Sequence, residues 1–186
     1  MACGTGKTFT ALRLAEQYAE NNGGRARVLF LVPSISLLSQ TLKEWTAQNQ
    51  EHLPLKSYAV CSDTKVSKKA EDIASYDLEV PVSTNGKDIA ERTAQGKRRK
   101  GLNVVFSTYQ SIKAIHEAQT LGMDDFDLVI CDEAHRTTGV TLAGEDASNF
   151  VRIHDADYIK ANKRLYMTAT PRLFDDTVKG KAEEHS

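Results

Sequence analysis

A glycine-rich segment that runs into lysine and threonine stands near the start of the chain, Gly4-Thr5-Gly6-Lys7-Thr8. The backbone N–H groups of such a turn can surround phosphate oxygens. The lysine ammonium can bind the outer phosphates of a nucleotide, and the threonine hydroxyl can reach a Mg²⁺ ion. We therefore expect Gly4, Thr5, Gly6, Lys7 and Thr8 to bind the phosphates of a nucleoside triphosphate.

An acidic pair, Asp132-Glu133, directly follows the apolar run 128–131. A carboxylate at the end of a buried strand can hold Mg²⁺, and a second carboxylate beside it can activate a water molecule. The pair could instead begin a helix, where acidic side chains favour the helix dipole, but that interpretation leaves Lys7 unexplained. Together with the glycine-rich segment, the pair predicts a triphosphatase site.

The beginning of the glycine-rich segment departs from the usual pattern G-x-x-x-x-G-K-[ST]. Counting back from Gly6 places Met1 where the first glycine of that pattern belongs. We interpret the chain as a piece that starts within the phosphate loop. We therefore expect the domain to lack its first strand, which normally leads into the loop.

Short apolar runs alternate with amphipathic stretches along the chain, and this alternation predicts the elements that must position the two motifs. Strands are predicted at 28–32, 56–62, 103–107, 127–131 and 164–167, and helices at 7–21, at 34–50 and from about 110. The pattern indicates an α/β fold, with a mainly parallel sheet that carries helices on both faces. Ligands of such sheets bind at the carboxyl ends of the strands, where both motifs stand.

The composition is that of one globular domain: 186 residues, 40% hydrophobic and 26% charged, with a formal net charge of −1. Because no broad basic field is present, any contact with nucleic acid must be local. The three cysteines, Cys3, Cys61 and Cys131, have no metal-ligand spacing and suit a reducing cytoplasm. No apolar stretch approaches the roughly 18 residues of a membrane span, so we expect a cytoplasmic protein without membrane contact.

The segment 63–101 is polar and interrupts the alternation of strands and helices. We expect it to be an insertion or long connection that carries one helix at about 88–95. The basic cluster 97–100 could bind a phosphate backbone, but a solvated loop is the favoured interpretation. The main domain is expected to cover residues 1–178, and residues 179–186 to form a tail or linker.

Three further segments stand at the predicted carboxyl ends of strands: Val32-Pro33-Ser34, 107–111 (STYQS) and 167–171 (MTATP). With the phosphate loop and the Asp-Glu pair, this set strongly resembles the motifs of superfamily 2 helicases and translocases. The resemblance covers essentially the whole chain and implies a P-loop NTPase fold, as the first of the two RecA-like lobes of that family.

A narrower resemblance involves the residues around three of these motifs, 1–8, 131–139 and 164–172. They are similar to the motors of Type ISP (single-polypeptide Type I) restriction-modification enzymes and of related restriction helicases with an Asp-Glu-Ala-His motif. The resemblance implies an ATP hydrolase in the full-length protein, with ATP and Mg²⁺ as cofactors.

Roles for four residues follow from the resemblance. Lys7 would contact the β- and γ-phosphates, Thr8 and Asp132 would hold Mg²⁺, and Glu133 would polarise the attacking water.

A fifth, His135, would be catalytic by linking the ATP site to the nucleic-acid side, with Thr168 and Thr170 as its coupling partners. For His135, the alternative of a structural histidine near a loop stays open.

The nucleic-acid face would be lined by five residues at strand ends: Pro33, Ser34, Thr108, Tyr109 and Gln110. They would bind phosphates through hydroxyl and backbone N–H groups, independently of base sequence. For Tyr109, an aromatic side chain that packs at the edge of the sheet is an equally good interpretation.

The favoured function is the ATP-binding lobe of a DNA-dependent ATPase or translocase in a restriction-modification enzyme. Its expected partners are duplex DNA, a second RecA-like lobe, and nuclease and methyltransferase domains of the same parent chain. Two alternatives stay open: a lobe of an RNA helicase with the same Asp-Glu-Ala-His motif, and a nucleotide-gated binding domain without enzymatic activity. Because the second lobe supplies an arginine finger, the isolated chain is expected to be inactive.

Overall fold

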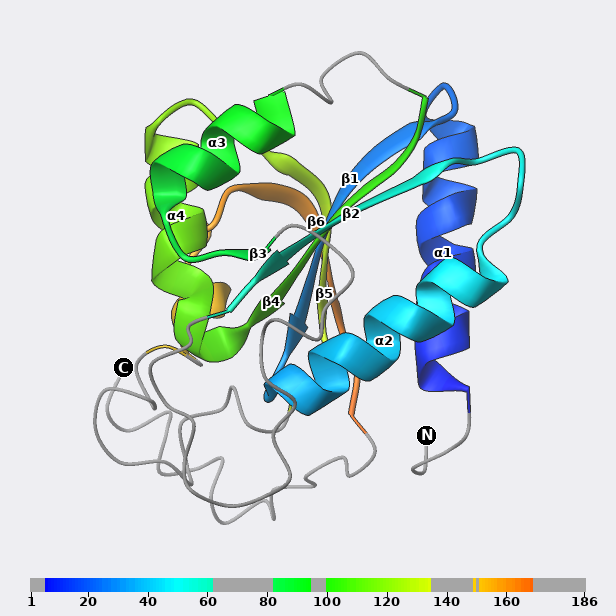
Figure 1. Cartoon of the computed structure of the whole chain (residues 1–186), viewed down its shortest axis with the longest axis horizontal. Coiled ribbons are helices and arrows are strands. Elements are labelled where there is room, and N and C mark those ends of the chain that lie inside the picture. The colour runs from blue at the N-terminus through cyan, green and yellow to red at the C-terminus, as the bar shows by residue number, and fades with distance from the viewer. Residues whose placement is uncertain (1–5, 62–81, 95–99, 135–148, 150, 169–186) are drawn as a thin grey trace, which may run out of the picture.

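A single parallel sheet forms the centre of the molecule. The computed structural model describes residues 6–61, 82–94, 100–134, 149 and 151–168. Six strands in these residues pair in the order β3-β2-β4-β1-β5-β6, and every pairing is parallel (Figure 1). The strands are β1 (Arg25–Val32), β2 (Leu55–Val60), β3 (Val82–Ser83), β4 (Gly101–Thr108), β5 (Phe126–Cys131) and β6 (Ala161–Tyr166). The predicted α/β fold with a parallel sheet is confirmed.

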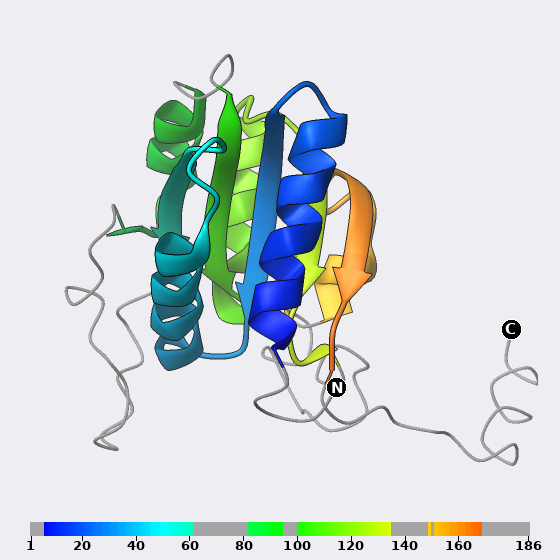
Figure 2. The ribbon, with the colours of Figure 1, turned by 90° about the vertical axis from the view of Figure 1, so that its right-hand side faces the viewer.

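Two pairs of helices cover the two faces of the sheet. Helices α1 (Lys7–Asn21) and α2 (Ile35–Gln48) lie on one face, and α3 (Gly86–Ala94) and α4 (Ile112–Thr120) on the other (Figures 1 and 2). Short 3₁₀ turns, η3 (Tyr109–Ser111) and η5 (Arg152–His154), complete the regular elements. None of the helices in the described residues is both long and apolar enough to cross a membrane.

Alternating residues of the central strand β1 point to opposite faces, which gives the sheet two hydrophobic layers. Val28 and Phe30 pack against α1 and α2, whereas Leu29 and Leu31 pack on the side of α3 and α4. The first layer is centred on Trp45, whose ring meets those of Phe30 and Phe106 edge-on at centroid distances of 5.3 and 5.5 Å. A strand buried on both faces explains why this run is continuously apolar in the sequence.

Residues 82–94 pair with the sheet and contribute to its hydrophobic core. Val82 of β3 pairs with Ala59 of β2, and α3 buries Ile89 and Ala90 on the face that it shares with α4. The predicted helix at 88–95 therefore exists as Gly86–Ala94, but a two-residue strand that the sequence did not indicate precedes it. Residues 62–81, most of the basic cluster 97–100 and the predicted tail 179–186 lie outside the described residues.

The carboxyl ends of the parallel strands and the first turn of α1 lie at the same end of the molecule (Figure 2). Val32 at the end of β1 lies beside Thr108 at the end of β4, and Leu31 lies beside Cys131 at the end of β5. On the other side of β5, Cys131 is paired with Tyr166 at the end of β6. The sheet therefore gathers four of the five predicted motifs at one edge, where α/β folds bind ligands.

Candidate active site

The phosphate-loop lysine stands in the first turn of α1, directly after a glycine in the left-handed conformation. Gly6 has φ 76°, and its carbonyl accepts a hydrogen bond of 2.8 Å from Thr10 N. A residue with a Cβ rarely adopts this φ, so the turn into the helix favours glycine here. The N–H groups at the start of a helix have no acceptor within the helix, which suits them to binding anions.

Lys7, Asp132 and Glu133 meet in one partly buried cluster. Lys7 Nζ lies 2.7 Å from Glu133 Oε1 and 3.7 Å from Asp132 Oδ1. The exposed fractions of the three side chains are 12% for Lys7, 12% for Asp132 and 20% for Glu133. The structure thus joins the two motifs that the sequence separates by more than half of the chain. An incoming phosphate group can therefore compete with Glu133 for the ammonium group of Lys7.

The turn that carries the two carboxylates has an unusual backbone conformation. Glu133 has φ 51°, and among the described residues it is the only non-glycine residue with a positive φ. Asp132 N donates to Leu31 O at 2.9 Å, and Asp132 Oδ1 accepts from Glu133 N at 2.9 Å. Non-glycine residues hold such a conformation only when their surroundings fix it, and these conformations cluster at active sites.

Burial raises the pKa of Asp132 above its usual value, and the nearby Lys7 ammonium opposes that shift. The hydrogen bond from Glu133 N also lowers the pKa of Asp132, whereas the Glu133 carboxylate raises it. A cation at this position favours the charged form of the carboxyl group.

The oxygen ligands near Asp132 suit a Mg²⁺ ion that binds together with a phosphate group. No group of three His, Cys, Asp or Glu side chains in the described part of the chain is arranged to hold a metal ion. Mg²⁺ is commonly held by one or two carboxylates together with phosphate and water oxygens. Asp132 offers one such carboxylate, and the half-buried Thr8 offers a hydroxyl in the first turn of α1. The residues present therefore fit an ion that is bound jointly with phosphate.

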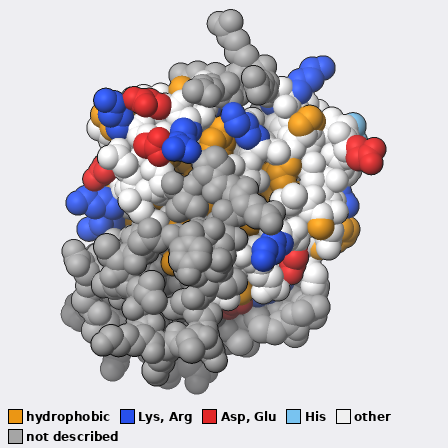
Figure 3. All heavy atoms as spheres, in the orientation of Figure 1, with side chains coloured by type: hydrophobic (Ala, Val, Ile, Leu, Met, Phe, Trp, Pro, Cys, Tyr) orange, Lys and Arg blue, Asp and Glu red, His pale blue; other side chains and the backbone are white. Residues whose placement is uncertain are grey.

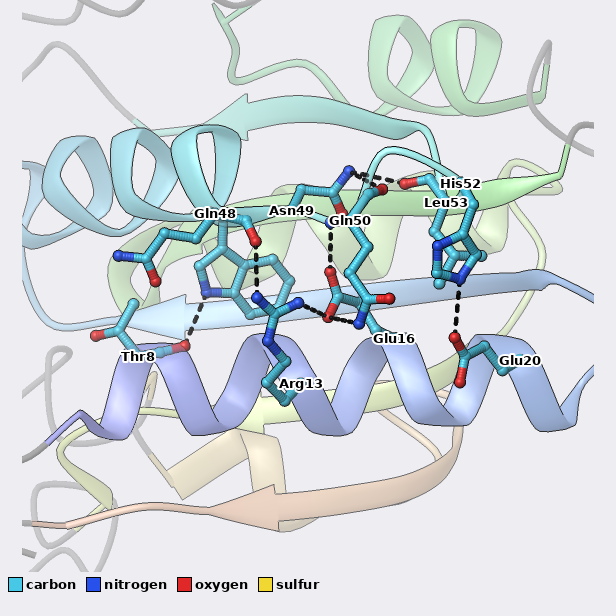
Figure 4. Close-up of polar contacts among 10 residues, drawn as sticks. Thr8, Arg13, Glu16, Glu20, Gln48, Asn49, Gln50, His52 and Leu53 are labelled. Carbon is cyan, nitrogen blue, oxygen red and sulfur yellow. Dashed lines mark hydrogen bonds and ion pairs between the residues drawn. The ribbon is translucent and has the colours of Figure 1, made fainter.

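A polar network fixes α1 to α2, so that the helix carrying Lys7 has a defined position (Figure 4). The indole Nε1 of Trp45 donates to Thr8 O at 3.2 Å, at the phosphate end of α1. Further along the helix, the buried carboxylate of Glu16 pairs with Arg13 and accepts from Gln50 N and Nε2 at 2.8 and 3.0 Å. The sequence reasoning missed this network, because a glutamate on a helix is usually a solvent-exposed residue.

All five predicted nucleic-acid residues lie at the ends of the neighbouring strands β1 and β4. Pro33 and Ser34 are half-buried, and Ser34 caps α2 by accepting a hydrogen bond of 3.3 Å from Leu37 N. The buried Thr108 hydroxyl donates to Ser111 Oγ at 3.1 Å, whereas Gln110 is exposed. The strand ends therefore bring these residues into one region, and Gln110 is the most accessible of them.

Tyr109 points into the protein and not toward solvent. Its side chain is fully buried, and its hydroxyl donates a hydrogen bond of 2.8 Å to Asp132 O. In this structure it does not line a nucleic-acid face, and packing, the alternative left open by the sequence, describes its position. The contact with Asp132 had no signal in the sequence, because it depends on how two strand ends meet.

The segment that contains Thr168 lies beside the acidic turn. Met167 N donates to Cys131 O at 2.8 Å, and Ala134 N donates to Met167 O at 2.8 Å. Thr168 follows directly and is half-buried. The predicted catalytic residue His135 and its coupling partner Thr170 lie outside the described residues, as do the phosphate-loop residues Gly4 and Thr5.

Comparisons with known proteins find restriction enzymes and viral helicases. Residues 1–173 match the family described as Type III restriction enzyme, res subunit. Over 173 residues the chain is 34% identical to the probable helicase A859L of African swine fever virus, covering 92% of this chain and 16% of that protein. The chain therefore spans about a sixth of the length of these viral relatives.

Two solved structures resemble the fold closely. One is the ATP-dependent Type ISP restriction-modification enzyme LlaBIII bound to DNA, with 43% identity and a TM-score of 0.79, over 92% of this chain and 11% of that one. The other is a nuclease-deletion mutant of the Type ISP enzyme LlaGI in complex with a DNA substrate mimic. It has 40% identity and a TM-score of 0.74, over 94% of this chain and 15% of that one.

Proposed function

Since this chain belongs to the family described as the Type III restriction enzyme res subunit, we propose that it is the ATP-binding lobe of a DNA-dependent motor. The motor would translocate along duplex DNA as part of a restriction-modification enzyme. Its relatives imply a family of helicase-like ATPases, and the likeness to two Type ISP enzymes at 40% identity or more supports the narrower assignment.

The cluster of Lys7, Asp132 and Glu133 is the observation that carries the proposal. Lys7 Nζ exchanges its contact with Glu133 for the outer phosphates of ATP, while the first turn of α1 supplies N–H donors. Mg²⁺, when bound, neutralises phosphate charge, and Thr8 and Asp132 are the residues that would hold it. Glu133, released from Lys7, then accepts a proton from the attacking water.

Contacts with DNA are proposed for the strand ends next to this cluster. Pro33 and Ser34 at the start of α2, with Thr108 and Gln110 after β4, are suited to phosphate contacts that do not depend on base sequence. On the face shown in Figure 3, the described Lys and Arg side chains are interspersed with Asp and Glu, which fits local contacts better than a broad basic surface.

Further domains complete the proposed motor. This chain spans 11–15% of the two restriction enzymes. We propose that a second RecA-like lobe closes the ATP site and supplies an arginine to the transition state, which can accelerate hydrolysis by about 10³–10⁵. Nuclease and methyltransferase domains in the same parent chain are the other proposed partners. The buried Cys131 is a free thiol, which fits a cytoplasmic setting.

Phosphate release by the full-length protein tests the class of nucleic acid. We expect duplex DNA to stimulate ATP hydrolysis, and single-stranded RNA to have little effect at the same nucleotide concentration. The Glu133→Gln variant serves as the control for contaminating ATPases, because it should lose the stimulated rate. A rate with RNA equal to or above the rate with DNA would assign the lobe to an RNA helicase instead.

A further inference from the structure

The residue proposed to activate water, Glu133, stands in a backbone conformation that a glutamate rarely adopts, with φ 51°. The orientation of its carboxylate depends on this conformation, because the side chain leaves the backbone at the same Cα. A conformation of this kind persists only where neighbouring groups fix it. The contacts that fix the peptide before Glu133 therefore contribute to placing the catalytic carboxylate.

Both polar groups of the peptide between Asp132 and Glu133 are bound by side chains. Its N–H, from Glu133, donates to Asp132 Oδ1 at 2.9 Å, and its carbonyl oxygen, from Asp132, accepts from the Tyr109 hydroxyl at 2.8 Å. The neighbouring bonds to Leu31 O and Met167 O are between backbone atoms, which any residue type except proline supplies. Among the described residues, Tyr109 and Asp132 are thus the two side chains that hold the plane of this peptide.

Tyr109 is well suited to hold the peptide because it is itself immobilised. It opens the turn η3 directly after β4, and its ring is fully buried in the layer that contains Ile112 and Cys131. A tyrosine hydroxyl is protonated at neutral pH, so it is able to donate. The donor therefore reaches the acidic turn from a rigid part of the sheet.

We propose that Tyr109 is a positioning residue for catalysis: its hydroxyl fixes the Asp132–Glu133 peptide and so aims the Glu133 carboxylate at the attacking water. The inference rests on the proposed function, because it assumes that Glu133 activates water. It gives Tyr109 a role in the chemical step, in place of the contact with nucleic acid that its sequence position suggests. Tyr109 touches neither phosphate nor water in this role and acts only through Glu133.

Tyr109→Phe in the full-length protein is the direct test, because it removes the hydroxyl and keeps the buried ring. The Km for ATP and the Kd of a nonhydrolysable ATP analogue should stay within about twofold of wild type. The kcat should fall by about tenfold, in the range seen when outer groups that orient catalytic ligands are removed. An unchanged kcat would overturn the proposal, and so would a loss of nucleotide binding, which would indicate a purely structural role.

Tyr58→Phe is the matched control for removing a buried tyrosine hydroxyl. Tyr58 is 6% exposed and donates to Arg92 O at 3.0 Å, on the far side of β4 from the acidic turn. We expect wild-type kcat for this variant. A kcat loss as large as that of Tyr109→Phe would show that the effect is not specific to the turn, and would contradict the proposal.

The double variant Tyr109→Phe/Glu133→Gln separates this inference from the proposed function. If Tyr109 acts through Glu133, removing its hydroxyl costs nothing further in single-turnover hydrolysis once the carboxylate is absent. A further tenfold loss in that background would show that Tyr109 acts elsewhere and would overturn the inference alone. If Glu133→Gln itself hydrolyses ATP at the wild-type rate, the proposed role of Glu133 fails, and the inference that rests on it fails with it.

Discussion

The ion pair between Lys7 and Glu133 must open before Lys7 can bind phosphate, and this competition can be measured. The two side chains are 2.7 Å apart and partly buried, with exposed fractions of 12% and 20%. In Glu133→Gln the uncharged amide competes more weakly for the lysine. We therefore predict that this variant binds ATP more tightly than wild type, although it hydrolyses ATP far more slowly.

The size of the effect follows from the environment of the pair. Ion pairs close to the surface contribute up to about 1 kcal/mol, because solvent screens the attraction and ordering two side chains costs entropy. Release from such a pair corresponds to a Kd for ATP that is about fivefold lower. Removing a negative charge next to the bound phosphates acts in the same direction. Loss of the base should reduce kcat by about 10²–10⁴.

Nucleotide titration of the full-length protein with a fluorescent ATP analogue and Mg²⁺ measures this Kd, and phosphate release measures kcat. Glu20→Gln is the control, because it removes a carboxylate of α1, the helix that carries Lys7, whose partner among the described residues is the exposed His52 at 2.9 Å. This control should leave both quantities unchanged. An ATP affinity of Glu133→Gln that equals or falls below that of wild type would refute the idea that Glu133 competes with phosphate for Lys7.

Three further outcomes are expected. The isolated 186-residue chain should release phosphate far more slowly than the ~1 s⁻¹ of an ordinary enzyme, because the proposed second lobe would not be there to neutralise the transition state. Turnover near that rate would contradict this view. Glu16→Ala should lower the free energy of unfolding of this chain, measured by urea denaturation, by about 2 kcal/mol, because Gln50 N loses its charged acceptor. The control Glu20→Ala should change this free energy by less than about 0.5 kcal/mol. Equal effects of the two variants would refute the role of the network. Burial raises the pKa of the Cys131 thiol from 9.0 to about 12, so iodoacetamide at pH 8 should alkylate Cys131 only after unfolding. The stability that this group contributes should fall as the pH rises from about 9 to 12. Rapid labelling of the native protein, seen by mass spectrometry, would contradict the burial.

The sequence predicted the order of elements well where the hydrophobic pattern was continuous. The strand predicted at 28–32 is the end of β1, and the helix predicted at 7–21 is α1. Burial on both faces leaves a continuous apolar run in a strand, and burial on one face leaves a periodic apolar stripe in a helix. The two-residue β3 was missed, since its pairing with β2 depends on a neighbour and not on a local pattern. A strand of two residues covers a single repeat of the alternating pattern, which is too short for that pattern to be recognised.

The candidate site was predicted in its main residues but not in its geometry. Spacing and residue type identified Lys7, Asp132 and Glu133, because phosphate and Mg²⁺ require a cation and carboxylates at strand ends. The left-handed backbone at Glu133 and its support by Tyr109 depend on a contact between the turns that follow β4 and β5, which no local pattern encodes. The buried carboxylate of Glu16 was missed for the same reason, because its acceptor role depends on the turn after α2.

Phosphate release with saturating duplex DNA, compared between the full-length protein and its Lys7→Ala variant, tests the central claim most directly. The claim is that the cluster of Lys7, Asp132 and Glu133 binds the phosphates of ATP in a DNA-dependent motor. Removing the ammonium group leaves the phosphates without their charged partner, so the variant should bind ATP weakly and lose the DNA-stimulated rate. If Lys7→Ala binds ATP as tightly as wild type and hydrolyses it as fast in the presence of DNA, this cluster is not the ATP site.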